Sequence, residues 1–247
     1  MLSVAYDLHL HSCLSPCGDE DMTPCNIAGM AVVKGLGAFA LTDHNSCKNC
    51  PAAAKAAEEY GLLFLPGMEL TTEEEVHVVC LFDTLPKAMA FDAMVHGRLL
   101  PVPNDPAVFG RQQIMGEEDR PRGEEELLLI NATSISFDEA FRLCEEYGGV
   151  AIPAHVDKSA NSLFANLGFI PPGCDFTCVE VKTPSKLPGL CAEHPELKTK
   201  RVLTSSDAHY LQDISEPEHF LHVQELSPAG LLEALRRGKQ SEKGDGL

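Results

Sequence analysis

The stretch D-L-H-L-H-S, residues 7 to 12, places an acid and two imidazoles at alternate positions near the beginning of the sequence. Successive side chains of a strand point to opposite faces, so Asp7, His9 and His11 are expected together on one face, opposite two leucines. The alternative is an exposed edge strand with a hydrated polar face, but the apolar neighbours Val4 and Ala5 favour a buried strand. Three polar groups on a buried strand indicate a site for chemistry.

Further imidazoles and carboxylates stand in or at the ends of later apolar stretches. They are Asp43 and His44 in L-T-D-H-N-S, Glu69 in L-P-G-M-E-L, His77 in E-V-H-V-V-C, His155 in A-I-P-A-H, and Asp207 and His209 in L-T-S-S-D-A-H. The carboxyl ends of parallel strands meet at one edge, so residues far apart in sequence can share a pocket. One such histidine is usually structural, whereas this repeated mixture is typical of a site for several divalent cations. A serine nucleophile is not indicated, because the sequence contains no G-x-S-x-G.

The elements that must position these residues follow a strand-then-helix repeat. Helices are expected at 23–35, 50–60, 86–97, 137–147 and 228–238, and strands at 2–8, 38–42, 62–68, 76–82, 149–154, 178–182, 201–205 and 219–224. Thr23-Pro24 and Ser136 are typical of helix starts, and Gly61, Gly148 and Gly238 of helix ends. Short buried strands alternating with helices predict an α/β fold with a parallel sheet, and this number of strands favours a barrel.

Residues 98–135 interrupt the repeat with prolines, charges and little periodicity, and are predicted to be an insertion. Within it, 111–115 and 126–131 are expected to form a hairpin around a hydrated acidic tip, 116–125. This insertion is either a plain surface excursion or a lid over the pocket. Residues 1–239 are predicted to form a single domain, and 240–247 a flexible tail.

Composition narrows the expected partners. Lysine and arginine total 19 against 37 acids, giving a net charge of −18 that should repel polyphosphate chains. A small partner is therefore expected, and no long nucleic acid. Neither a membrane span nor a signal-like segment is evident, so a cytoplasmic location is expected, with no membrane partner. Most of the ten cysteines are expected to be reduced thiols, although Cys47-x-x-Cys50 and Cys174-x-x-x-Cys178 have spacings that could bind zinc.

The segments D-L-H-L-H-S, L-T-D-H-N-S, G-M-E-L, P-A-H and S-D-A-H together resemble the motif regions of the PHP-domain (polymerase and histidinol phosphatase) family, in order and across nearly residues 5 to 210. The resemblance implies a distorted (β/α)7 barrel of the PHP type, to which the sequence adds the insertion as a lid-like segment. It also implies two or three divalent metal ions, for which zinc, manganese and iron are equally suited. By the same resemblance, one metal is held by His9, His11, Glu69 and Asp207, a second by Glu69, His77 and His155, and a third by His44, His209 and an early aspartate.

That aspartate is where the sequence departs from the family pattern. Many relatives have S-D-G soon after H-x-H-S, whereas this chain reads H-S-C-L-S-P-C-G-D-E-D. Asp19 is the predicted ligand, and Asp21, Glu20 or Cys17 could stand in for it. Asp7 and Asp43 are expected to orient neighbouring imidazoles, a common role for carboxylates behind metal-bound histidines.

The predicted reaction is the hydrolysis of a small phosphate ester, such as a phosphomonoester or nucleotide-like substrate, by a metal-activated hydroxide. Glu69, Asp207 and His209 are the predicted catalytic residues, and Lys158, Lys182 and Asn45 the predicted substrate-binding ones. Three alternatives stay open: an oligonucleotide exonuclease or phosphodiesterase, a histidinol-phosphate phosphatase, and a non-catalytic metal-binding module. The oligomeric state is also left open.

Overall fold

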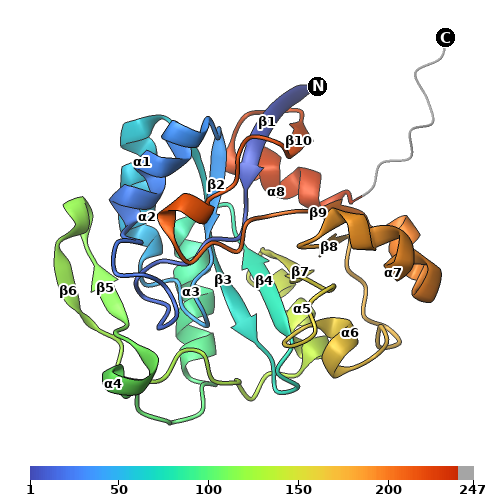
Figure 1. The fold of residues 1–247 in the computed structure, drawn as a ribbon, viewed down its shortest axis with the longest axis horizontal. Helices are drawn as coiled ribbons and strands as arrows, with labels where there is room; N and C mark the ends of the chain where they lie inside the picture. Colours follow the sequence, from blue (N-terminus) through green and yellow to red (C-terminus); the bar gives the residue numbers. More distant parts are fainter. Residues whose placement is uncertain (239–247) are drawn as a thin grey trace.

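The computed structural model describes residues 1–238 and forms a mixed α/β fold around one curled sheet (Figure 1). The predicted tail, 240–247, lies outside the described residues. In hydrogen-bonding order, the sheet contains β10 (Phe220–Val223), β1 (Leu2–Asp7), β2 (Ala38–Leu41), β3 (Leu63–Thr71), β4 (His77–Leu81) and β7 (Val150–Pro153). Two further strands, β8 (Cys178–Glu180) and β9 (Arg201–Leu203), form a separate parallel pair.

The predicted parallel repeat holds for only part of this sheet. β1, β2 and β3 are parallel, but β4 is antiparallel to both β3 and β7, and β10 is antiparallel to β1. Hydrogen-bonded pairing among the described strands ends at β7 and at β10, so the sheet is a half-barrel rather than a closed ring. The fold agrees with a barrel of the PHP type, whereas seven regular β/α units are not seen.

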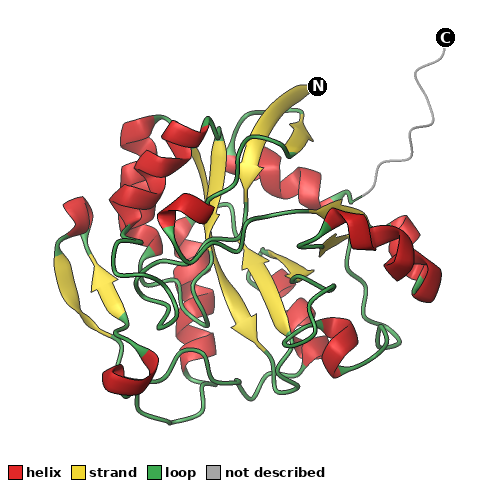
Figure 2. Ribbon diagram, in the orientation of Figure 1, coloured by secondary structure: helices red, strands yellow, loops and turns green. Residues whose placement is uncertain are grey.

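Helices cover both faces of the sheet (Figure 2). Their bounds are α1 (Pro24–Lys34), α2 (Cys50–Tyr60), α3 (Leu85–His96), α5 (Phe137–Glu146), α6 (Leu163–Asn166), α7 (Leu187–Glu193) and α8 (Pro228–Arg236). Ser136 caps α5 by accepting a hydrogen bond from the Glu139 N–H. The left-handed φ of 69° at Gly61 ends α2, a conformation that glycine adopts without strain. None of the described helices is long and apolar enough to cross a membrane.

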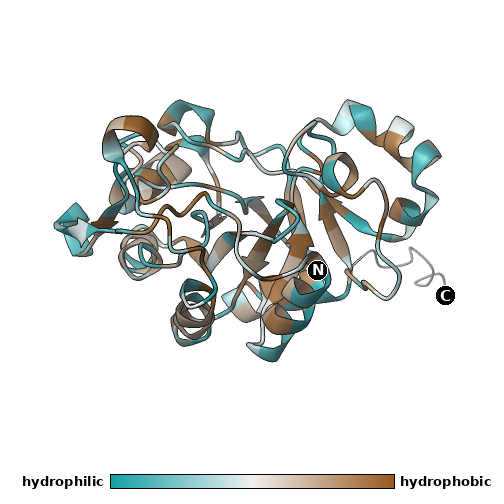
Figure 3. Cartoon of the chain, turned by 90° about the horizontal axis from the view of Figure 1, so that it is seen from below, coloured by the Kyte–Doolittle hydropathy of each residue, from teal (hydrophilic) through white to brown (hydrophobic). Residues whose placement is uncertain are grey.

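The core lies on the two faces of the sheet because side chains alternate along each strand. In β2, Phe39 and Leu41 join the apolar cluster under α1, α2, α3 and α5. Ala38 and Ala40 point the other way, into a second cluster that α8 completes. Figure 3 shows the hydrophobic strands between more hydrophilic helices. This packing fixes the strand ends, where the polar residues are found.

The insertion, 98–135, contains α4 (Pro106–Phe109), β5 (Gln113–Met115) and β6 (Pro121–Glu124). The predicted first hairpin strand is confirmed, but the second is wrong, since β6 lies inside the expected tip. The apolar run that was expected to pair instead packs inward, where Leu129 contacts Leu14 and Leu99. The hairpin turn binds the start of α1, because Asp119 accepts hydrogen bonds from Thr23 Oγ1 and the Cys25 N–H. The hairpin thus lies at the outer side of α1 and α2 (Figure 1), and the described residues do not confirm a lid.

Candidate metal centre

Eight imidazole and carboxylate side chains converge at one edge of the sheet. They come from the loop after β1 (His9, His11), the loop after β2 (His44), β3 (Glu69), the first residue of β4 (His77), the loop after β7 (His155) and the loop after β9 (Asp207, His209). His77 begins its strand rather than ending it. It reaches the same edge because β4 is antiparallel to β3, with His77 paired to Thr71.

Glu69 occupies the middle of this group and is 1% exposed. Its Oε1 atom lies 2.9 Å from His77 Nδ1, 3.0 Å from His155 Nε2 and 3.2 Å from His9 Nε2. Its Oε2 atom lies 3.1 Å from His44 Nδ1 and 3.3 Å from His11 Nε2. The two oxygens of one carboxylate therefore face different sets of imidazoles.

Asp207 and His209 complete this group of side chains. Asp207 Oδ1 lies 3.3 Å from His11 Nε2 and 3.5 Å from His9 Nε2, and Lys158 donates to Oδ2. The rings of His209 and His11 stack with centroids 4.3 Å apart. Asp207 adopts a left-handed φ of 49°, an uncommon conformation of the kind found at functional sites.

Burial and mutual attraction set the charges of the cluster. Burial would raise the pKa of Glu69, but the imidazoles of His77, His9 and His44 outweigh it and hold that pKa well below its usual range. Burial lowers the pKa of His11, yet the carboxylates of Asp207 and Glu69 raise it to about 9. The cluster thus concentrates negative charge that protons or cations can neutralise, and cations compete with protons for such ligands.

The donor atoms suit divalent metals. Three triplets have ligand atoms within 4.8 Å of one another: His9, His11 and Glu69; His44, Glu69 and His77; and His11, His44 and His209. His155 Nδ1 is buried with no hydrogen-bond partner among residues 1–238. His9 Nε2 and His11 Nε2 face each other at 3.2 Å, as two ligands of a common ion would. Nitrogen and carboxylate donors fit zinc, manganese and iron.

The carboxylate behind His9 was missed by sequence reasoning. Glu180, in β8, is 3% exposed, lies 2.9 Å from His9 Nδ1 and accepts a hydrogen bond from the His155 N–H at 3.1 Å. Such a partner fixes the ring orientation of a ligating histidine. The available signal was an acid between apolar residues in C-V-E-V, on a strand already predicted.

The two acids predicted to orient imidazoles behave differently. Asp43 accepts hydrogen bonds from Ser12 and from Ser15 Oγ, which lies 3.0 Å from His11 Nδ1, so its effect on His11 passes through a serine. Asp7 makes no hydrogen bond or ion pair with an imidazole among residues 1–238, so that prediction is wrong. It accepts from the N–H groups of Ser206 and Ser215, both at 3.0 Å, and so anchors the loop that carries Asp207 and His209.

The structure does not bring the predicted early ligand into the triplets. The Asp19 N–H donates to the His209 carbonyl at 2.9 Å, while its carboxylate accepts from the Asp21 N–H at 3.0 Å. Glu20 and Asp21 are exposed. Cys17 is exposed as well. Asp19 as a metal ligand therefore stays a prediction.

The three predicted substrate-binding residues occupy different positions. Lys158 lies at the cluster, bound to Asp207. The Lys182 N–H is held by Asp157 at 2.7 Å. Asn45 is 1% exposed, and its amide donates to the carbonyls of Leu129 and Asn131 and accepts from the Thr71 N–H. The Asn45 amide thus connects the insertion to the strand ends. A substrate could bind this amide only if these hydrogen bonds were broken.

The cysteines agree with the prediction of reduced thiols. All ten are free, and those of the C-x-x-C motif are buried. Cys47 Sγ and Cys50 Sγ lie 3.1 and 3.4 Å from the same acceptor, the Gly67 carbonyl. Neither this pair nor Cys174 and Cys178 belongs to a metal-like triplet in the described part of the chain.

Comparison with known proteins places these features in a family. The family model described as "PHP domain" matches residues 7–161. The chain is 37% identical over 90 residues to a 5′-3′ exoribonuclease of Haemophilus influenzae, and 36% identical over 84 residues to the 5′-3′ exoribonuclease Rnm of Salmonella typhimurium. These alignments cover 34% and 32% of this chain, and 32% and 28% of the relatives. The chain thus matches about a third of each relative's length.

Solved structures share the fold over nearly the whole chain. The lesion-specific endonuclease EndoQ of Pyrococcus furiosus has a TM-score of 0.65 at 19% identity, over 95% of this chain and 56% of that one. An Endonuclease Q complex with a 27-mer duplex gives 0.66 at 18% identity, over the same shares of the two chains. A putative metal-dependent phosphoesterase of Bifidobacterium adolescentis gives 0.57 at 20% identity, over 95% and 96%.

The expectation that net charge excludes a long nucleic acid is wrong. Two matched relatives are exoribonucleases, and a structure of the same fold holds a DNA duplex. Net charge is a property of the whole surface, whereas binding depends on the local field at the site. Since the family model covers more than half of the sequence and includes most of the residues gathered around Glu69, this chain belongs to the PHP domain family of metal-dependent phosphoesterases.

Proposed function

We propose that this chain hydrolyses phosphodiester bonds in nucleic acid with divalent metals held around Glu69. The observation that supports this most strongly is the Glu69 carboxylate, whose two oxygens face separate groups of imidazoles. The matched exoribonucleases favour nucleic acid as the substrate class.

The residues divide into groups around that carboxylate. We assign one metal to His9, His11, Glu69 and Asp207, a second to Glu69, His77 and His155, and a third to His44 and His209 with Asp19. When bound, such metals supply a hydroxide near neutral pH and neutralise phosphoryl oxygens. The protein keeps the ligands in place: Glu180 orients His9, Ser15 orients His11, and Asp7 anchors the loop of Asp207.

Lys158 is the side chain best placed to meet the substrate. Its ammonium contacts Asp207 Oδ2, and its side chain is 40% exposed. An ammonium has three donors, so one hydrogen bond to Asp207 leaves two for phosphoryl oxygens. We therefore assign Lys158 to substrate orientation, with Asp207 holding it beside the metals.

The test is a comparison of kcat/KM on a mononucleotide, a dinucleotide and single-stranded oligomers of RNA and DNA. Protein freed of metal is reconstituted with manganese, zinc or iron, and Glu69→Gln controls for contaminating nucleases. We expect the diesters to be cleaved and the oligomers to be at least as good as the dinucleotide.

A small phosphomonoester is the second candidate, favoured by the net charge of −18. Release of phosphate from a mononucleotide, with diesters left intact, would replace our proposal with this one. Histidinol phosphate belongs in the same panel. Bound metal without turnover of any ester would indicate a non-catalytic module.

A further inference from the structure

A pocket of about 400 Å³ opens directly beside the metal centre. It is lined by His77 and His155, which belong to the cluster, and by Lys158, Ser159, Ala160, Asn161 and Lys186. No aspartate or glutamate is among its described lining residues, in a chain that has 37 acids. Asp207 and Asp157, the acids paired with Lys158 and Lys186, lie outside this lining, so the lining itself offers ammonium groups to an anionic ligand.

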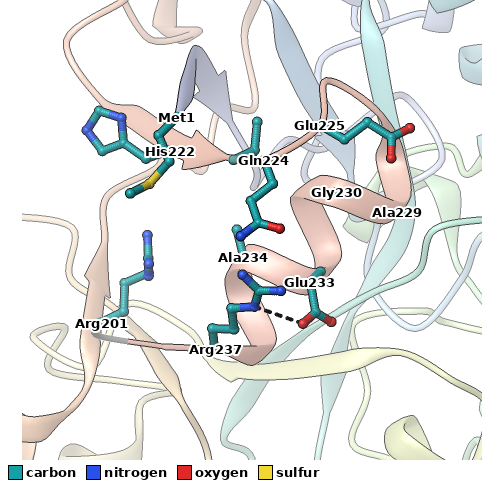
Figure 4. Close-up of a pocket in the computed structure, with 11 residues that line it drawn as sticks. Met1, Arg201, His222, Gln224, Glu225, Ala229, Gly230, Glu233, Ala234 and Arg237 are labelled. Carbon is teal, nitrogen blue, oxygen red and sulfur yellow. Dashed lines mark hydrogen bonds and ion pairs between the residues drawn. The ribbon is translucent and has the colours of Figure 1, made fainter. Parts of the chain in front are cut away.

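A second pocket, by contrast, has acids among its lining residues. It has a volume of about 210 Å³ and lies beside the start of β1, β10 and α8 (Figure 4). Its cations, Arg201 and Arg237, are accompanied by Glu225 and Glu233. Arg237 is paired with Glu233 at 2.9 Å, so here the acid belongs to the lining itself, whereas the acids paired with Lys158 and Lys186 lie outside the lining of the first pocket.

Lys158 and Lys186 lie on two neighbouring loops, and the carboxylate of Asp157 joins these loops. Asp157 accepts hydrogen bonds from the N–H groups of Lys182 at 2.7 Å and Thr183 at 3.0 Å, which ties the loop after β7 to the loop after β8. Lys186 ends the short 3-10 turn that follows, and its ammonium lies 3.1 Å from the Asp157 carbonyl. The Asp157 side chain is 1% exposed, whereas that of Lys186 is 55% exposed. Asp157 is thus a buried carboxylate that joins the two loops, and its Oδ2 atom also lies 3.5 Å from the Lys186 Nζ. The exposed Lys186 ammonium has three donors, so it can still bind a ligand.

We propose that this pocket binds the phosphate adjacent to the scissile phosphate of an oligonucleotide, with Lys186 as its main contact; this rests on the proposed function. A phosphate at the metals lies against His77 and His155, and the next phosphate of the strand enters the pocket that these histidines border. Lysine binds phosphate as a mobile point charge. The preferred substrate is therefore a short strand that carries at least two phosphates.

The experiment compares substrates that differ by one phosphate. Bis(p-nitrophenyl) phosphate and an unmodified dinucleotide each have one phosphate, and dinucleotides with an added 5′- or 3′-terminal phosphate have two. We expect one terminal phosphate to raise kcat/KM roughly tenfold, mainly through KM, as for a hydrogen bond to a charged group. Lys186→Gln should remove this advantage and leave the rate on bis(p-nitrophenyl) phosphate unchanged.

Lys55→Gln is the matched control, because it removes one exposed lysine charge on α2, away from the pocket. It should leave the preference for the terminal phosphate intact. The inference is overturned if diesters are cleaved with no terminal-phosphate advantage, or if the advantage survives in Lys186→Gln. It also fails if Lys186→Gln slows bis(p-nitrophenyl) phosphate equally, since Lys186 would then act on the metal centre. Wild-type protein that binds metal but cleaves none of the diesters would instead refute the proposed function.

Discussion

Glu69 is the residue on which both halves of the cluster depend, since five imidazole nitrogens lie within 3.3 Å of its two oxygens. Glu69→Gln keeps the volume but replaces one oxygen with an N–H₂ group that cannot bind a cation. We expect the fold to persist, metal content per chain to fall and hydrolysis to drop by about 100-fold or more. Elemental analysis, circular dichroism and turnover measure these effects. Wild-type metal stoichiometry together with wild-type activity would remove the bridging role.

A change at Glu180 tests whether the carboxylate that contacts His9 affects metal binding. Glu180→Gln weakens the acceptor that orients His9, so metal affinity should fall roughly 10- to 100-fold, as for other partners of ligating histidines. Competition with a chelator measures the dissociation constant. Glu233→Gln, on the exposed side of α8, should leave it unchanged. Equal affinities in Glu180→Gln and wild type would mean that His9 needs no such partner.

At this scale, the sequence predicts which side chains gather at the site better than it predicts the hydrogen bonds that hold them in place. The histidines and Glu69 stand at recognisable strand ends, and the structure gathers them. Asn45 is predicted to bind substrate, but its left-handed φ of 48° accompanies an amide directed to the insertion. Asp43 acts on His11 through the hydroxyl of Ser15. This contact depends on the conformation of the loop, which the spacing of these residues in the sequence does not predict.

Among the elements, helices and strands were predictable because apolar periodicity reports burial. The predicted helix 50–60 matches α2, and every predicted strand of the repeat is present. Strand direction was less well predicted. Five residues, 72–76, separate β3 from β4, which is too short for the crossover that parallel strands require. That gap could have predicted the antiparallel pair. The hairpin error arose because residues such as Leu129 are apolar for core packing, not for strand pairing.

The buried side chain of Gln112 connects separate backbone segments of the insertion, and its contribution to stability can be measured. The Gln112 amide donates to the carbonyls of Glu125 and Leu127 and accepts from the Leu129 N–H, so Gln112→Ala leaves three backbone groups unpaired. We expect the free energy of unfolding to fall by about 3 kcal/mol, measured by urea denaturation. Gln113→Ala is the control, since the hydrogen bond of residue 113 to Cys13 is made by its backbone. Equal stability of the two variants would contradict this anchoring role.

For the whole molecule, the net charge of −18 should govern how salt affects long substrates. Nucleases that bind DNA through many phosphate contacts lose affinity steeply between about 50 and 200 mM salt. Here, added salt screens repulsion over most of the surface and weakens attraction only near the metals and lysines. We expect the KM of a single-stranded oligomer to stay level or fall over that range. A steep rise in KM, measured at constant metal concentration, would indicate an extended basic track.

The pairing of β1 with β10 has a consequence for how the chain is made. Leu2 lies opposite Val223, so β1 finds one of its two neighbours only after about 220 further residues have been synthesised. At typical synthesis rates of 5–20 residues per second, this delay is roughly 10 to 45 s. Closing so long a loop also costs entropy and slows the final step of folding. During this interval, the nascent β1 has an unpaired edge, and the ligands that follow β1 and β9 are not yet assembled. The addition of Asp207 and His209 to the cluster should therefore be one of the last events in maturation.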